Sequence, residues 1–129
     1  MAKILIIDDD PDIVEGMKVV LESKDYEVSN AKSGEDGIKK AKQEKFDLVI
    51  LDVMMETKDK GFEVAREIKK ENKDIPIIML TAIKEKLGFD FKGESGDQDW
   101  LPVDDYLDKP LKPQELIAKV ESFLKKANG

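Results

Sequence analysis

Three aspartates directly follow a run of aliphatic residues near the start of the chain, in the stretch ILIIDDDPDI at residues 4–13. A further aspartate, Asp52, follows a second aliphatic run, FDLVIL at residues 46–51. Carboxylates crowded together raise one another's pKa and destabilise a fold unless a cation offsets their charge. A hard cation that takes oxygen ligands, such as Mg2+, is the natural partner. Asp8, Asp9 and Asp52 are therefore the candidate metal ligands.

The third aspartate of the run, Asp10, has a different expected role because Pro11 follows it. Aspartate is a favoured helix N-cap residue, and proline is favoured at the first helical position. We interpret Asp10 as the cap of a helix that starts at Pro11. Ser33 and Pro113 give similar start signals for later helices.

Five short runs have the length of strands, and segments with helical spacing of apolar residues separate them. The expected strands cover residues 3–7, 26–31, 46–51, 75–80 and 103–107. Runs buried on both faces, alternating with amphipathic helices, predict a parallel sheet built from right-handed βαβ units. We predict an α/β fold in which a doubly wound, five-stranded parallel sheet carries helices on both faces.

Ligands of an open α/β sheet bind outside the carboxyl ends of its strands. The expected first strand ends at Asp8 and Asp9, and the third ends at Asp52. The fourth ends at Thr81 and the fifth near Lys109. We expect all five side chains to share one edge of the sheet, where an ammonium and a hydroxyl group join the carboxylates.

The composition narrows the possible functions. The 129 residues suit a single domain, which we expect to span residues 1–129. Cysteine and histidine are absent, which excludes thiolate and histidine metal sites, cysteine nucleophiles and histidine general bases. The formal net charge is -7 and the lysines are scattered, so we expect no direct binding to nucleic acid.

No apolar run approaches the roughly 20 residues of a membrane span, and no signal-peptide core follows the first residues. We therefore expect a cytoplasmic protein without membrane contact. One stretch departs from the alternation of strands and helices: residues 84–104 contain three glycines and little helical periodicity. We predict an irregular insertion there.

The chain resembles a receiver domain of the response regulators of two-component signalling along nearly its whole length. The matching stretches, in the receiver order, are LIIDDDPDI, DLVILDVMM, IIMLTA and DDYLDKPLKPQEL. Together they form a specific pattern, whereas any one of them alone is weak. The resemblance implies a flavodoxin-like sheet with strand order 2-1-3-4-5.

The resemblance also implies roles for the acidic residues. Asp52 becomes the phosphoacceptor, and Asp8 and Asp9 become the acid pair that holds Mg2+. The backbone carbonyl of Met54 becomes a further metal ligand. Such a site does not need a histidine of its own, because phosphoryl transfer depends on alignment and charge neutralisation more than on a base.

By the same resemblance, Thr81 and Lys109 contact the phosphoryl group, and Thr81 and Tyr106 form the switch that responds to phosphorylation. The phosphoryl donor is then a sensor histidine kinase or a phosphotransfer protein. The receiver signals by changing a surface that another protein recognises. It is not an enzyme with a separate substrate, although it catalyses its own phosphorylation and dephosphorylation. We expect no output domain, because the chain ends shortly after its last predicted helix.

Two other functions compete with this interpretation. A pseudo-receiver would bind proteins without being phosphorylated, but the complete set of acids, threonine and lysine argues against it. A Mg2+-dependent phosphohydrolase with an aspartyl-phosphate intermediate usually has a second aspartate two residues after the first. Met54 occupies that position here.

Overall fold

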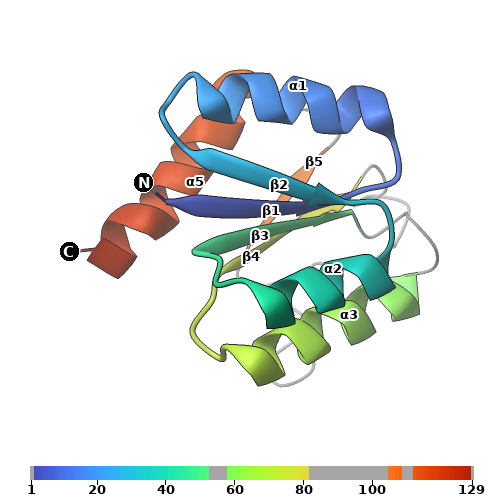
Figure 1. Cartoon of the computed structure of the whole chain (residues 1–129). Coiled ribbons are helices and arrows are strands. Elements are labelled where there is room, and N and C mark those ends of the chain that lie inside the picture. Colours follow the sequence, from blue (N-terminus) through green and yellow to red (C-terminus); the bar gives the residue numbers. More distant parts are fainter. Residues whose placement is uncertain (1, 53–57, 82–104, 109–111, 129) are drawn as a thin grey trace.

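The structure is a computed structural model that describes residues 2–52, 58–81, 105–108 and 112–128. Strands and helices alternate along most of the chain. In chain order they are β1 (Lys3–Ile7), α1 (Pro11–Glu22), β2 (Glu27–Ala31), α2 (Gly34–Gln43), β3 (Leu48–Asp52), α3 (Lys58–Glu71), β4 (Ile77–Thr81), β5 (Asp105–Asp108) and α5 (Pro113–Asn128). Figure 1 shows how these elements are arranged.

The strands form one parallel sheet in the order β2-β1-β3-β4-β5. The predicted parallel α/β sheet and the order of its first four strands, 2-1-3-4, are confirmed. β5 lies beside β4, with Asp105 opposite Ile78 and Asp108 opposite Thr81. β2 pairs with one side of β1, and β3 pairs with the other side. The strand order therefore reverses between β1 and β3, which is the topological switch point.

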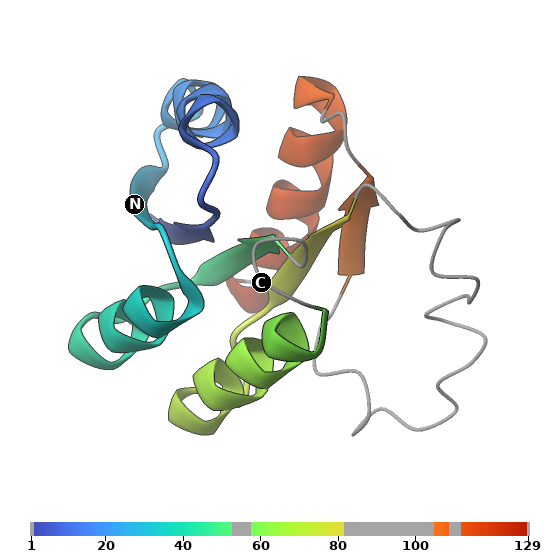
Figure 2. The same cartoon turned by 90° about the vertical axis from the view of Figure 1, so that its right-hand side faces the viewer.

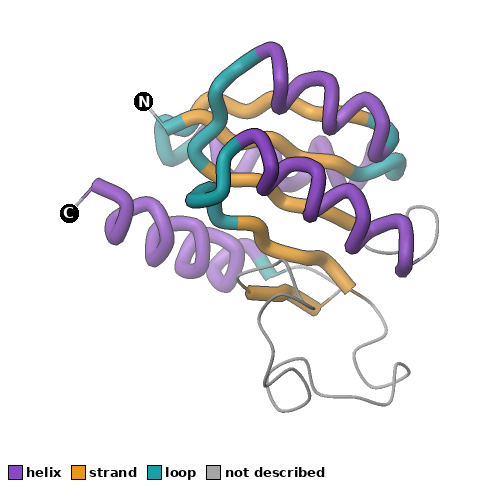
Figure 3. The backbone as a smooth tube through the Cα atoms, turned by 90° about the horizontal axis from the view of Figure 1, so that it is seen from below, coloured by secondary structure: helices purple, strands orange, loops and turns teal. Residues whose placement is uncertain are grey.

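Helices cover both faces of the sheet, as predicted. In Figure 2, α1 and α5 lie on one side of the strands, and α2 and α3 lie on the other. Figure 3, viewed from the α2 and α3 side, shows these two helices next to each other over the strands. Because strand side chains alternate between faces, β1, β3 and β4 each contribute to two separate cores.

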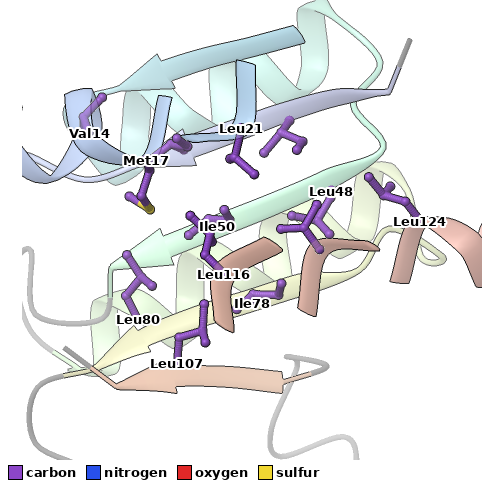
Figure 4. Packing of buried hydrophobic residues seen from close by; sticks show 13 residues of the cluster. Val14, Met17, Leu21, Leu48, Ile50, Ile78, Leu80, Leu107, Leu116 and Leu124 are labelled. Atoms are coloured by element: carbon purple, nitrogen blue, oxygen red, sulfur yellow. The ribbon is translucent and has the colours of Figure 1, made fainter. Parts of the chain in front are cut away.

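The core under α1 and α5 is a large apolar cluster. Ile50, Ile78 and Leu80 of the sheet pack there against side chains of the two helices (Figure 4). Those helix residues are Val14, Met17, Leu21, Leu116, Val120 and Leu124. The second core joins Leu5, Ile7, Val49, Leu51 and Ile77 to α2 and α3. The sheet is thus buried on both faces, which explains its continuous apolar runs.

The helix starts agree with the capping chemistry of the sequence. The Asp10 carboxylate accepts hydrogen bonds from the backbone N–H groups of Asp12 and Ile13, and Pro11 is the first residue of α1. The Ser33 hydroxyl caps α2 by accepting from Asp36 N at 3.1 Å. Both predicted caps are confirmed, and α5 begins at Pro113.

Three predictions fall on residues that the structure does not describe: the irregular insertion at 84–104, the metal ligand Met54 and the phosphoryl contact Lys109. They stay predictions. Within the described ranges, none of the helices has both the length and the apolar character needed to cross a membrane.

Candidate functional site

The register between β1 and β3 brings the first and third strand ends together. Ile7 lies opposite Leu51 in the parallel pair, so the next residues on the two strands are Asp8 and Asp52. These two residues also continue the face of the sheet that carries Ile6 and Ile50, under α1 and α5. The site therefore forms at the switch point, at the carboxyl ends of the strands, as the sequence predicted.

Asp8, Asp9 and Asp52 form an acid cluster in which one carboxylate oxygen from each residue lies within 4.8 Å of the others. Asp8 is 1% exposed and Asp52 is 3% exposed, while Asp9 is exposed to solvent. Two of the three charges are thus largely removed from water, which is costly for carboxylates unless other groups compensate. The exposed side of the cluster, at Asp9, leaves room for water ligands.

Backbone groups hold the first aspartate of the cluster in place. Asp8 N donates to Ala31 O of β2 at 3.0 Å, which extends the pairing of β1 with β2 by one residue. Asp10 N donates to Asp8 Oδ1 at 2.9 Å. Asp10 therefore has two roles, because its side chain caps α1 while its backbone orients Asp8. The sequence indicated only the first role.

The acid cluster has the chemistry of a divalent cation site. Its three donors are carboxylate oxygens, which hard cations prefer over nitrogen or sulfur. Mg2+ is bound in proteins through one or two carboxylates and keeps several waters, and a cluster with one exposed member suits that pattern. Two buried carboxylates and one exposed carboxylate can therefore hold such an ion at this edge.

For two of the remaining predicted site residues, Thr81 and Tyr106, the structure describes only the position of the backbone. Met54 and Lys109 lie outside the described residues. Thr81 is the last residue of β4, one position beyond the residue opposite Asp52, and it lies opposite Asp108 of β5. Its backbone is thus at the same edge as the cluster. Tyr106 lies within β5, opposite Met79.

A close contact between α2 and β1 was not predicted. A Cβ built on Gly37 would lie 2.3 Å from Ile7 Cδ1 and 2.7 Å from Ile7 Cγ1, so a larger residue at this position would require the Ile7 side chain to move. Ile7 is fully buried and directly precedes Asp8. The available signal was the pair of glycines, Gly34 and Gly37, at the start of a predicted helix, where glycine is otherwise unfavourable.

Comparison with known proteins relates this arrangement to one family. Residues 4–121 match the model of the response regulator receiver domain. The chain is 38% identical over 125 residues to the alkaline phosphatase synthesis transcriptional regulatory protein PhoP of Bacillus subtilis, covering 97% of this chain and 49% of PhoP. The chain spans about half the length of the curated relatives it matches.

Solved structures agree with that match. A two-component response regulator from Clostridium difficile superposes with a TM-score of 0.80 at 32% identity and covers 100% of both chains. The response regulator TrrA from Thermotoga maritima superposes with a TM-score of 0.77 at 38% identity, over 96% of this chain and 100% of TrrA. The parallel sheet, the acidic edge and these matches lead to one conclusion: the chain belongs to the response regulator receiver domain family.

Proposed function

We propose that this chain is a phosphoacceptor receiver that takes a phosphoryl group on Asp52 with the help of Mg2+. The observation that carries the proposal is the acid cluster, which joins Asp52 to Asp8 and Asp9 at the switch point of the sheet. Support also comes from TrrA, whose structure was solved in complex with Mg2+ and BeF. In this chain Asp8, Asp9 and Asp52, completed by the Met54 carbonyl, would hold Mg2+.

The chemistry needs a nucleophile in line with the phosphorus atom and positive charge around the phosphoryl oxygens. An oxygen of the Asp52 carboxylate forms a bond to phosphorus while the bond from phosphorus to the donor breaks. The leaving group keeps the bonding electrons, and the product is an acyl phosphate on Asp52. Bound Mg2+ supplies positive charge that the two neighbouring carboxylates cannot.

Three further residues complete the proposal. The Lys109 ammonium pairs with the phosphoryl group, and the Thr81 hydroxyl donates a hydrogen bond to it. Tyr106, on the neighbouring strand β5, responds to that contact as the switch residue. The five-stranded order 2-1-3-4-5 supports this set, because it brings the ends of β4 and β5 to the edge that holds Asp52.

The partners follow from the chemistry. The chain has no histidine of its own, so a histidine that donates the phosphoryl group must belong to another protein. We assign the role of phosphoryl donor to a sensor histidine kinase or a phosphotransfer protein. We place this reaction in the cytoplasm. The output is a protein surface that changes on phosphorylation. The chain turns over no separate substrate, and its phosphorylation and dephosphorylation are its own reactions. Residues 1–129 act as one receiver domain, which itself contacts neither nucleic acid nor membrane.

The test is the intact mass of the protein after incubation with acetyl phosphate and Mg2+. We expect the addition of one phosphate to the wild type and none to Asp52→Asn. Asp47→Asn is the matched control, because Asp47 lies at the other end of β3 and carries the same charge. It should be phosphorylated like the wild type. A wild type that gains no phosphate would favour the pseudo-receiver instead.

A further inference from the structure

A pocket at the amino end of the sheet is a further feature of the molecule that can bind another group. Its volume is about 410 Å3, and residues 41–46 line it together with Ile68, Glu71, Asn72 and Ile75. These residues form the C-terminal ends of α2 and α3 and the connections to β3 and β4. In Figure 1 the C-terminal ends of α2 and α3 lie at the opposite end of the strands from the carboxyl ends, where the acid cluster lies, so the α2–α3 pocket is on the other side of the sheet from that cluster.

The floor of the α2–α3 pocket is apolar and fixed in place. Phe46, Ile68 and Ile75 belong to the core beneath α2 and α3. The Phe46 ring also lies under the Lys3 ammonium, 5.4 Å from the ring centre. A floor that is anchored in this way is preformed, so a ligand would not bear the cost of ordering it.

The charged residues that line the α2–α3 pocket are two lysines and two glutamates, and the two lysines are available to a ligand. Lys42 and Lys45 line the pocket and are exposed, and neither forms an ion pair with a carboxylate of the described part of the chain. The nearby Glu44 carboxylate is already paired with Lys3 at 2.5 Å. Glu71 is the remaining acid of the lining. A ligand entering the pocket therefore meets two ammonium groups before it meets the apolar floor.

The wider surroundings have the opposite charge to the molecule as a whole. Residues 39–47 and 66–74 contain eight lysine or arginine residues and five acidic ones, a local charge of +3 in a chain of formal charge -7. Lysines in the last turns of α2 and α3 offset the negative ends of the two helix dipoles. Lys45 and Lys73 lie beyond the helices and add positive charge. The negative net charge of the molecule repels an anionic partner, whereas the positive charge around the α2–α3 pocket attracts it.

We propose that the α2–α3 pocket is a docking site for an acidic segment of a partner protein. The segment inserts one apolar side chain toward Phe46, Ile68 and Ile75, and its carboxylates pair with Lys42 and Lys45. The pocket has the size of an ordinary ligand site, which accommodates a single anchoring side chain. This docking is independent of phosphorylation, because no residue of the acid cluster takes part in it.

The test uses NMR titration of the unphosphorylated protein with the peptide acetyl-Glu-Asp-Leu-Asp-Glu-amide. We expect amide shifts concentrated at residues 41–46 and 68–75. The variant Lys42→Glu/Lys45→Glu should weaken binding at least tenfold. The control variant Lys24→Glu/Lys112→Glu makes the same change in net charge at exposed lysines outside the pocket and should bind nearly as the wild type does.

Two altered peptides separate the contribution of the apolar anchor from that of the acidic side chains. A peptide with serine in place of leucine should bind severalfold more weakly, since the anchor is missing. A peptide with lysine in place of each acid should cause no shifts at the pocket. Equal binding of the acidic and basic peptides, shifts at another surface, or no shifts at millimolar peptide would each overturn the proposal.

Discussion

Charged groups are arranged in opposite ways at the two ends of the parallel strands, which we call the carboxyl edge and the amino edge of the sheet. At the carboxyl edge, three like charges gather within 4.8 Å, and two of them are buried. At the amino edge, the Lys3 ammonium donates to Glu44 Oε1 at 2.5 Å and forms an ion pair with it, and the backbone N–H of Lys3 donates to Asp47 Oδ2 at 2.7 Å. Paired charges help to hold β1 against the connection from α2 to β3. Gathered like charges work against the fold, and the cation that we propose for this site would offset them.

The largest expected effect is on Mg2+ affinity at the carboxyl edge. Asp9→Asn and Asp52→Asn each remove a charged oxygen ligand, and we expect each to weaken Mg2+ binding at least about tenfold, or about 1.4 kcal/mol. The measurement is a titration with Mg2+ followed by calorimetry. Asp47→Asn, at the amino edge, should keep the wild-type affinity. Equal losses in all three variants would contradict the contrast between the edges.

The next effect concerns α2, which packs against Ile7 on the face of the sheet opposite to the acid cluster. Gly37→Ala forces a methyl group against Ile7, and we expect a net loss of about 1–2 kcal/mol in the free energy of unfolding. Gly16→Ala is the matched control, since Gly16 lies inside α1 and a Cβ added there would have nothing within 4 Å. It should gain about 0.5–1 kcal/mol from helix propensity. Denaturant unfolding of the two variants measures both values.

Gly37→Ala also tests how the end of β1 is positioned. Because Ile7 directly precedes Asp8, a displaced Ile7 shifts the acid cluster. We expect weaker Mg2+ binding in Gly37→Ala and unchanged binding in Gly16→Ala. If Gly37→Ala were destabilised but bound Mg2+ like the wild type, α2 would support the fold without positioning the site.

A smaller effect is expected on stability without metal. Asp9→Asn removes one of three like charges from the cluster, so the metal-free variant should be more stable than the wild type by about 0.5 kcal/mol. Added Mg2+ should reverse the order, because a ligand at 100 times its Kd stabilises the protein that binds it by about 2.7 kcal/mol. Thermal unfolding with and without Mg2+ gives both comparisons. A metal-free variant less stable than the wild type would show that the like charges do not oppose folding.

The smallest effect is expected from the ion pair at the amino edge, whose side chains are 26% and 39% exposed. The hydrogen bond from Lys3 lowers the pKa of Glu44 below 4.5, and the bond to Glu44 raises the pKa of Lys3 above 10.5. The pair therefore adds stability at neutral pH. That stability is lost as the pH falls through the lowered pKa of Glu44 and as it rises through the raised pKa of Lys3.

Unfolding measured across pH checks this pair. Glu44→Gln should be slightly less stable than the wild type at neutral pH, and the difference should vanish at both extremes. Glu63→Gln, an exposed acid on α3, serves as the control and should show no such dependence. A difference that persists unchanged into acid would mean that the Glu44 charge is not its source.

Much of this molecule follows from local patterns in its sequence. The period of the apolar residues predicted the strands and helices. The predicted boundaries of β1 match the structure, and those of β2 and β3 shift by one or two residues. Asp10 and Ser33 were predicted as caps, because a capping side chain bonds backbone groups two or three residues away. The rule that ligands meet the carboxyl ends of parallel strands then predicted the edge that holds Asp8, Asp9 and Asp52.

What the sequence could not determine involves contacts between distant segments. The placement of Asp8 beside Asp52 depends on the register of two strands that lie more than forty residues apart. The approach of Gly37 to Ile7 and the pairing of Lys3 with Glu44 also join separate elements. Periodicity and capping are decided within a few residues, so the sequence alone determined the elements and their acidic ends. Burial, register and close approach arise when those elements pack, and only the tertiary structure decided them.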